Sequence, residues 1–330
     1  AWAQVSSIEF VSLSSTGTQG ASDSFQPSVS DDGNLVAYAS DASTLVAGDT
    51  NGFTDIFVFD RTTLAVRRVS VSSGGAQANG ASFAPQLSAD GLFVTFQSTA
   101  SNLVAGDTNG RSDIFVYDLT LSTIARVSVA TGGAEGNQDA TDARISADGR
   151  FVFFASPATN LVAGDTNGRV DVFRHDRQSG VTEIVSLADD ETLSDSNSGL
   201  PFPSADGNLV VFQSLATNLV PGVTDVYQKI YLRDITAGTT TVISVADASF
   251  GAPVNGASSQ PVMSADGSLI AFQSDANNLV LADSGLTDIF VVYRNLGLTL
   301  RASVAPSSGG GANASSFFPS LSADGHYLAF

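Results

Sequence analysis

The chain has 330 residues, of which 43% are hydrophobic and 14% charged, and its 33 acidic and 14 basic side chains give a net charge of -19. A field of that sign repels nucleic acid and anionic lipid and attracts cations, so we expect no nucleic-acid partner. No apolar run approaches the roughly 18 to 20 residues that a membrane-spanning helix needs. The absence of cysteine excludes disulfides, zinc-thiolate sites and thiol catalysis.

The start of the chain bears on its location. Ala1-Trp2-Ala3 fits the small-residue end of a secretory signal. The chain also has a single lysine, Lys229. These features favour an exported protein, extracellular or periplasmic, over a cytosolic one, and the lack of cysteine does not oppose this, because many secreted proteins also lack it.

An Asp-Gly dipeptide recurs along the whole chain at intervals of 58 residues, with one interval of 60. Its aspartates are Asp32, Asp90, Asp148, Asp206, Asp266 and Asp324. A fixed period with short strands and Gly-rich turns is typical of one supersecondary unit repeated radially or linearly. Because one repeat family runs from end to end, we predict a single domain over residues 1–330.

Each repeat is predicted to hold four antiparallel strands, which in the first repeat cover residues 25–30, 35–40, 55–60 and 65–71. The Asp-Gly dipeptide makes the tight turn between the first two strands. The second strand is apolar on both faces, which indicates sheets packed on sheets. We expect an outer strand at 5–14, full repeats at about 24–72, 82–130, 140–188, 198–246 and 258–305, and a partial repeat at 316–330.

These motifs carry a resemblance to a known family. A Ser-x-Asp-Gly turn, an apolar strand ending in Ser, a strand such as Asp113-Ile114-Phe115-Val116-Tyr117-Asp118 and a final Arg-Val-Ser-Val resemble the WD40-like PD40 repeats of TolB-type β-propellers. The resemblance implies an all-β propeller of four-stranded antiparallel blades. The turn differs from the family's usual Ser-Pro-Asp-Gly, as at Ser146-Ala147-Asp148-Gly149. No segment resembles the amino-terminal domain of TolB or an attached peptidase domain, so the resemblance implies no activity.

Counting strands predicts six blades closed by the amino-terminal strand, with the last blade one strand short. One interpretation is that the natural chain continues past Phe330 and supplies that strand and even a seventh blade. The other is that a second chain donates the strand and gives head-to-tail assembly.

An acidic loop between the second and third strands carries the predicted chemistry. In three repeats it places oxygen-bearing side chains at its first, third and seventh positions and a backbone carbonyl at its fifth. Calcium takes six to eight hard oxygen ligands, and a glycine-turned loop can wrap them round one ion. We therefore predict up to three Ca²⁺ sites, without the closing glutamate of an EF-hand. Their residues are Asp49, Asn51, Phe53 and Asp55; Asp107, Asn109, Arg111 and Asp113; and Asp165, Asn167, Arg169 and Asp171.

The alternative for these loops is that Asp and Asn side chains only bond their own backbone in Asx turns. Calcium is favoured because paired carboxylates on a sheet edge repel each other unless a cation neutralises them. In the fourth repeat Lys229 takes the place of the last carboxylate, so a tethered ammonium is expected to replace the ion. The fifth loop, Asp283 to Asp288, is one residue shorter.

Motifs for catalysis are weak. His175 and His326 lie in no motif, no nucleophile elbow supports a Ser-His-Asp triad, and no phosphate or dinucleotide fingerprint occurs, so no catalytic or organic-cofactor residue is predicted. The first functional hypothesis is a non-enzymatic, calcium-stabilised scaffold for protein–protein interaction. The alternative is a hydrolase or lyase that acts on extracellular polysaccharide in the propeller channel. A third hypothesis is self-assembly through the incomplete blade.

Overall fold

The computed structural model describes residues 9–250, 252–281, 285–304 and 313–330. In this part of the chain the regular elements are β-strands and two 3₁₀ turns, η1 (Ala248–Phe250) and η2 (Arg294–Leu296), and no helix is long and apolar enough to cross a membrane. The chain divides into two compact units, unit 1 (Ala1–Arg126) and unit 2 (Val127–Phe330). The signal-like residues 1–3 and residues 5–8 of the predicted outer strand lie outside the described residues.

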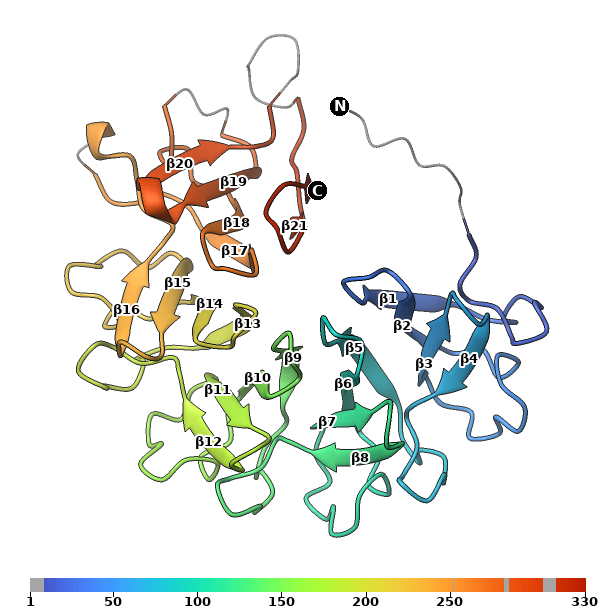
Figure 1. Cartoon of the computed structure of the whole chain (residues 1–330). Helices are drawn as coiled ribbons and strands as arrows, with labels where there is room; N and C mark the ends of the chain where they lie inside the picture. The colour runs from blue at the N-terminus through green and yellow to red at the C-terminus, as the bar shows by residue number, and fades with distance from the viewer. Residues whose placement is uncertain (1–8, 251, 282–284, 305–312) are drawn as a thin grey trace. The chain divides into compact units, whose positions relative to one another are not determined.

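Unit 1 contains two four-stranded antiparallel sheets, in the orders β1-β2-β3-β4 and β5-β6-β7-β8 (Figure 1). The first is built from β1 (Ser24–Val29), β2 (Leu35–Ser40), β3 (Asp55–Asp60) and β4 (Ala65–Arg68). The second is built from β5 (Ser82–Leu87), β6 (Phe93–Ser98), β7 (Asp113–Asp118) and β8 (Thr123–Arg126).

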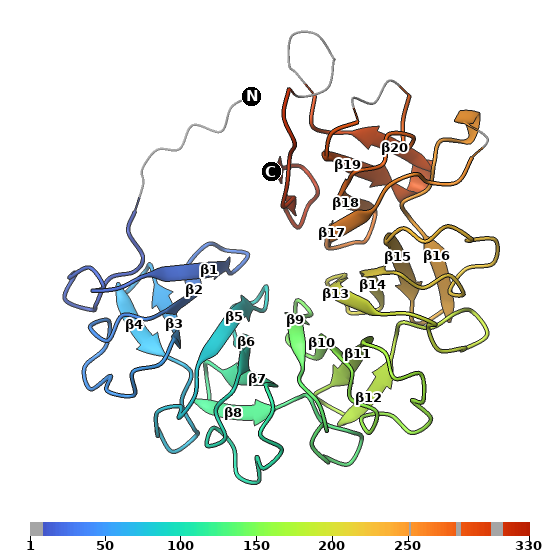
Figure 2. The same ribbon diagram turned by 180° about the vertical axis from the view of Figure 1, so that it is seen from behind.

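Unit 2 contains three such sheets and a final hairpin, seen from behind in Figure 2. The third sheet holds β9 (Thr141–Ile145), β10 (Phe151–Ser156), β11 (Asp171–Asp176) and β12 (Val181–Ile184). The fourth holds β13 (Ser198–Pro203), β14 (Leu209–Ser214), β15 (Lys229–Asp234) and β16 (Thr239–Val242). The fifth holds β17 (Ser258–Met263), β18 (Leu269–Ser274), β19 (Asp288–Tyr293) and β20 (Leu298–Arg301), and the hairpin holds β21 (Ser320–Leu321) and β22 (Leu328–Ala329).

The central two strands of every sheet pair in the same register, because the same apolar pattern must be buried on both faces. In the first sheet Tyr38 lies opposite Phe57, and their rings stack with centroids 6.0 Å apart. In the third sheet Phe154 and Phe173 stack at 5.5 Å. The same ring pair recurs in the other three sheets and forms a repeated core layer.

The first strand of each of the five full repeats contains a β-bulge that the sequence pattern did not reveal. Pairing between β1 and β2 skips from Phe25 to Ser28, and Gln26 within the bulge has a left-handed φ of 52°. The same left-handed position recurs at Ala84, Asp142, Leu200, Gln260 and Phe318. Proline follows it in most repeats, as at Pro27, and needs no ladder hydrogen bond there.

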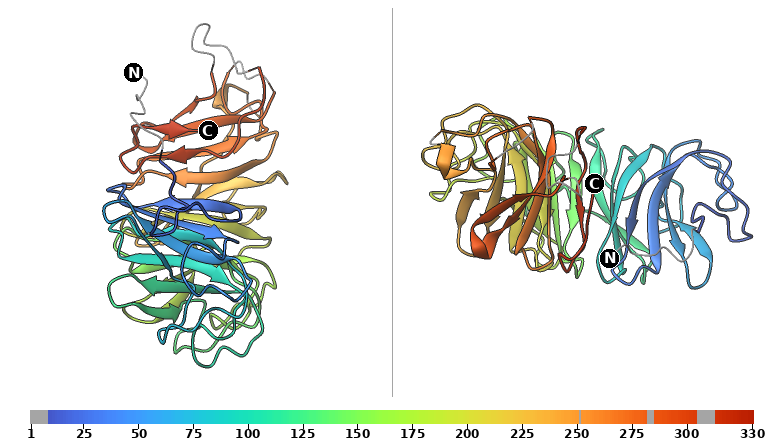
Figure 3. Two further views of the ribbon diagram at one scale, coloured as in Figure 1. Left: turned by 90° about the vertical axis from the view of Figure 1, so that its right-hand side faces the viewer. Right: turned by 90° about the horizontal axis from the view of Figure 1, so that it is seen from above.

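Neighbouring sheets pack face to face within each unit. In unit 1, β5 lies against β1 and β2, and the interface is filled by Ala37, Val58, Val94 and Phe96, all at most 3% exposed. In unit 2, β13 packs on β9 and β10, and β17 on β13 and β14, as the stacked strands of Figure 3 show. Because of this packing the strands between neighbouring sheets are buried on both faces, as the apolar pattern predicts.

The structure confirms the all-β class and the four-stranded antiparallel sheets. Strands 35–40 and 55–60 are found as predicted, whereas the first strand starts and ends one residue earlier and the fourth ends at Arg68. In the described part of the predicted outer strand, residues 9–14, the only β pairing is the bridge between Leu13 and Gln19. Ring closure and blade number stay predictions.

Candidate cation-binding loops

The acidic loops lie where the second strand of each sheet passes to the third. We call residues 45–55 the first loop, 102–113 the second and 160–171 the third. The last residue of each loop is also the first residue of the third strand, so the sheet fixes its carboxylate: Asp55, Asp113 and Asp171 are each fully buried.

An arginine fills the space between the carboxylates of the first loop. Arg68 Nη1 lies 2.8 Å from Asp49 Oδ1 and 3.1 Å from Asp55 Oδ2, and all three side chains are at most 9% exposed. Arg68 comes from the end of β4, opposite Phe57 in the sheet. The guanidinium therefore supplies the positive charge that the pair of carboxylates requires.

The second loop has the same arrangement. Arg126 Nη1 lies 3.1 Å from Asp107 Oδ1 and 3.2 Å from Asp113 Oδ2. Arg126 occupies the position of Arg68, because it lies opposite Phe115 at the end of β8. Two of the three predicted calcium loops thus hold a protein cation between their acidic groups.

Among the three loops, only the third has no arginine at this position. Ile184 lies opposite Phe173 at the end of β12 and cannot pair with a carboxylate. Asp165 is 6% exposed and Asp171 is fully buried. Asp165 Oδ1 is buried and has no hydrogen-bond partner.

The asparagine of each loop makes the Asx turn that was the alternative to a metal ligand. Asn167 Oδ1 accepts a hydrogen bond from the Arg169 amide at 2.9 Å, and its Nδ2 donates to Asp171 Oδ2 at 2.8 Å. Asn51 does the same with the amide of Phe53 and with Asp55, and Asn109 with the amide of Arg111 and with Asp113. The fifth-position residues therefore contribute their amides to the turn, and their carbonyls remain the predicted ligands.

The serine of the Arg-Val-Ser-Val motif holds the last carboxylate of the loop. Ser186 Oγ donates to Asp171 Oδ1 at 2.8 Å and accepts the Val172 amide at 3.1 Å. Ser194 donates to the same Oδ1 at 3.0 Å. Ser70 makes the equivalent contacts with Asp55 and the Ile56 amide. In the first repeat the motif thus orients Asp55 through both its arginine and its serine, whereas the third repeat, with Ile184 in place of the arginine, keeps only the serine.

The fourth and fifth repeats balance their charges in other ways. Lys229 replaces the buried aspartate, is 3% exposed, and forms an ion pair with Asp225. Its Nζ also donates to the Tyr227 carbonyl at 3.1 Å. In the fifth repeat Arg301 Nη1 lies 3.5 Å from Asp288 Oδ2. Asp283 lies outside the described residues.

Burial governs the electrostatics of the third loop. Loss of hydration and, to a lesser extent, the nearby Asp171 charge raise the pKa of Asp165 to about 6. Burial also raises the pKa of Asp171. In the first loop burial likewise raises the pKa of Asp49, but the Arg68 charge opposes it. Only the third loop lacks such an opposing charge among the three.

The sequence reasoning missed the arginines. Arg68 and Arg126 were visible as part of a repeated motif. Their role beside the carboxylates could have been suspected because Ile184 replaces the arginine in only one of the three repeats. Among the described residues no group of three or more His, Cys, Asp or Glu side chains is placed to hold a metal. A cation in any of these loops would need carbonyl or water oxygens beside the two carboxylates.

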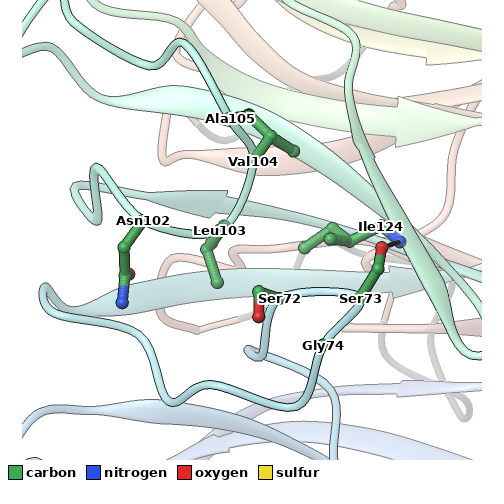
Figure 4. Close-up of a pocket in the computed structure, with 8 residues that line it drawn as sticks. All are labelled: Ser72, Ser73, Gly74, Asn102, Leu103, Val104, Ala105 and Ile124. Carbon is green, nitrogen blue, oxygen red and sulfur yellow. Dashed lines mark hydrogen bonds between the residues drawn. The ribbon is translucent and has the colours of Figure 1, made fainter.

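A pocket forms where the second acidic loop meets the preceding connection, and another forms at the equivalent place beside the third loop. In unit 1 it has a volume of about 450 Å³ and is lined by Ser72, Ser73, Gly74, Asn102, Leu103, Val104, Ala105 and Ile124 (Figure 4). Unit 2 has the corresponding pocket of about 400 Å³, lined by Ala130, Thr131, Thr159, Asn160, Leu161, Val162, Ala163 and Thr182. Neither lining contains a titratable or aromatic side chain.

A side chain from the same connection binds a backbone amide of the fourth strand, which is an edge strand of its sheet. Ser73 Oγ accepts the Ile124 amide at 3.1 Å, which Figure 4 shows beside the pocket. Thr131 Oγ1 accepts the Thr182 amide at 3.0 Å, and Asp189 accepts the Thr240 amide at 2.6 Å. We call these contacts edge latches; each joins residues 51 apart in the sequence.

Successive four-stranded antiparallel sheets that pack face to face fit the β-propeller class of proteins. No protein-family model matches the sequence, and no curated protein matches it. The PD40 resemblance therefore stays a prediction.

Solved structures share the fold. A puromycin-hydrolyzing peptidase from Mycobacterium tuberculosis is similar with a TM-score of 0.51 and 11% identity, over 85% of this chain and 38% of that one. A putative TolB from Agrobacterium tumefaciens has a TM-score of 0.48 and 14% identity, over 86% of this chain and 81% of that one. A PL25 ulvan lyase has a TM-score of 0.41 and 10% identity, over 88% of this chain and 75% of that one. This chain thus spans well under half of the peptidase, and these likenesses concern the fold alone.

Proposed function

We propose that this chain is an exported, non-enzymatic scaffold of the β-propeller type that binds another protein through its repeated pockets. The observation that supports this is the recurrence of one pocket, built by equivalent residues, in both compact units. A repeated pocket suits a partner that is held at more than one point, because linked contacts add avidity that a single shallow site lacks.

The chemistry of the pocket favours binding over catalysis. Its lining offers hydroxyl and amide groups, such as Ser73 and Asn102, above an apolar floor that includes Leu103 and Ile124. General acid–base catalysis needs a titratable group within reach of the substrate, and neither lining supplies one. A few polar groups around an apolar floor are what a side chain of an extended peptide requires.

A protein partner is favoured over a glycan by the same linings. Sugar rings pack their C–H faces on aromatic side chains, and both pockets lack these. The pocket side chains are also neutral, so binding would depend little on salt.

Site-specific photocrosslinking in the organism that makes the protein tests this function. A benzophenone amino acid would replace Ala105 in one variant and Ala163 in another, since both are exposed at a pocket rim. The matched control carries the benzophenone amino acid at Leu92, which is 45% exposed. Leu92 lies in the turn before β6, whereas pocket residues such as Ala105 follow the other end of that strand. We expect one protein to be crosslinked at both pocket positions and not at Leu92. Equal crosslinking at all three positions, or none, would overturn the proposal.

The polysaccharide hydrolase or lyase alternative is tested on the same protein. The purified chain would be incubated with extracellular polysaccharides, with calcium and with chelator, and the products followed as new reducing ends or as unsaturated sugars. We expect no turnover. Cleavage that tracks the protein through purification would replace the scaffold by the enzyme.

A further inference from the structure

We propose that the third loop binds one calcium ion through Asp165 and Asp171, and that the first and second loops do not, because arginine takes the place of the ion there. This inference does not rest on the proposed scaffold function. It rests on three loops of one construction that differ in their source of positive charge.

The three loops share one backbone framework. Asn51, Asn109 and Asn167 donate to the following aspartate at 2.9, 3.0 and 2.8 Å. The glycines after them, Gly52, Gly110 and Gly168, all adopt left-handed φ angles between 62° and 72°. A single nitrogen, Arg68 Nη1, touches both carboxylates of the first loop, so the framework aims two oxygens at one point.

The third loop keeps this framework but loses the arginine and the group beside it. Gln77 Oε1 lies 3.3 Å from Arg68 Nη1 in the first loop. Beside the third loop, Leu193 occupies the position that Gln77 has beside the first loop, as the bridges Val71–Gln77 and Leu187–Leu193 show. Ile184 and Leu193 therefore offer no positive or polar group, and two buried carboxylates remain.

A further sign of a missing ligand is the carboxylate of Asp165, which differs from the carboxylates of Asp49 and Asp107 in having no arginine beside it. Asp165 Oδ1 has no hydrogen-bond partner, although the residue is 6% exposed. Burial of an unpaired carboxylate oxygen is costly, and native structures rarely tolerate it without water or an ion. Asp171 is held differently: its Oδ1 accepts Ser186 and Ser194, whereas its Oδ2 accepts only Asn167. The equivalent Oδ2 of Asp55 accepts both Asn51 and Arg68, so this oxygen has room for a second partner.

The donor set selects the ion. Two carboxylates are hard oxygen ligands, and with no His or Cys among the loop residues a soft transition metal is disfavoured. Calcium accepts irregular oxygen sets completed by a carbonyl, here the predicted Arg169 carbonyl, and by water. Asn167 already bonds the Arg169 amide and Asp171, so it positions Asp171 rather than binding the ion. So few carboxylates place the affinity in the roughly 10⁻⁴–10⁻³ M range of extracellular calcium modules.

Calorimetric titration with calcium of four forms of the whole chain tests the assignment. We expect one ion for the wild type and none for Ile184→Arg, which installs the arginine of the first two loops. Asp165→Asn is also expected to bind none. Arg126→Ile, which removes the arginine from the second loop, is expected to bind two. Circular dichroism of each form establishes that it is folded.

The outcomes separate the alternatives. Three ions in the wild type would mean that calcium displaces the arginines, and no ion would mean that a proton neutralises the pair; either result overturns the proposal. An unchanged single ion in Ile184→Arg would place the ion elsewhere. If Ile184→Arg does not fold, Asp165→Asn and Arg126→Ile still test the proposal. Loss of the bound ion in Asp165→Asn and gain of a second ion in Arg126→Ile cannot both result from one structural defect. Titration with magnesium in place of calcium is expected to give weaker binding.

Discussion

Arg68 Nη1 lies 3.1 Å from Asp55 Oδ2, and both side chains are more than nine-tenths buried. Removal of one partner of a buried ion pair leaves an uncompensated charge, which typically costs about 3–5 kcal/mol. We therefore expect Arg68→Leu to lower the free energy of unfolding by an amount in this range in calcium-free buffer. Urea unfolding followed by circular dichroism measures it.

The chain offers a matched control for this prediction. Arg61 pairs with Glu9 at 3.0 Å, but both side chains are about half exposed, at 41% and 52%. Exposed pairs contribute about 0–1 kcal/mol. An Arg61→Leu variant as unstable as Arg68→Leu would show that loss of any arginine, rather than burial of its partner, is responsible.

The raised pKa of Asp165 predicts an unusual pH dependence. The folded state binds the proton of this carboxyl more tightly than the unfolded chain, since its pKa is about 6 against an ordinary 3.8. In chelator, protonation of Asp165 should therefore add stability as the pH falls from 7 through 6 toward 4, and this contribution is lost as the pH rises. Thermal unfolding at a series of pH values measures it.

Asp165→Asn separates this effect from the general relief of negative charge on acidification. The variant keeps the side-chain shape but cannot titrate, so its unfolding temperature should rise less between pH 7 and pH 5 than that of the wild type. Parallel curves for the two proteins would show that Asp165 titrates normally.

Ser186 is expected to contribute more to the free energy of unfolding than an exposed serine does. Ser186→Ala leaves Asp171 Oδ1 with one of its two serine donors and the Val172 amide without its acceptor, and these groups are buried beside the third loop. A buried group deprived of its partner costs about 1–3 kcal/mol. Hydrogen exchange of the Val172 amide should accelerate accordingly. Ser101→Ala, which removes an exposed contact with Asn79, should change the unfolding free energy by less.

The turn between the third and fourth strands of the first sheet contains a site where glycine should stabilise the protein. Leu64 has a left-handed φ of 59° and is 62% exposed, whereas the third, fourth and fifth repeats have Gly180, Gly238 and Gly297 at this turn position. A left-handed conformation costs a residue with a side chain about 1–2 kcal/mol. Leu64→Gly is therefore expected to raise the midpoint of urea unfolding.

The reverse exchange tests the same cause. Gly180→Leu places a side chain at a φ of 72° and should destabilise the chain by a similar amount. If both substitutions destabilise the protein, packing of the Leu64 side chain outweighs the backbone strain.

Much of the fold follows from the sequence because its signals are local and repeated. The Asp-Gly turns set the period, and the apolar second strand sets the burial of each sheet, so strands 35–40 and 55–60 could be predicted to the residue. The left-handed bulge at Gln26 could not, because nothing in the residue type announces a positive φ. The proline after it was the only available sign.

The candidate site was predicted in outline for the same reason. The acidic side chains are close in sequence, so their clustering around one glycine turn could be read directly. Arg68 lies 13 residues beyond Asp55, on another strand, and reaches it only through the pairing register of β3 and β4. A motif treated as a strand marker therefore contained the charge that, in our proposal, decides which loops bind an ion.

The edge latches have a consequence for how such a chain changes in length. Each latch joins residues 51 apart, which is less than the 58-residue period, so both partners fall within one period counted from the connection before the repeat, such as residues 73–130. Duplication or deletion of one whole copy by recombination would carry a complete latch with it and leave its neighbours intact. Genes for chains of this construction can therefore gain or lose repeats in one step, whereas a partial copy would leave a fourth strand without the side chain that binds its edge amide.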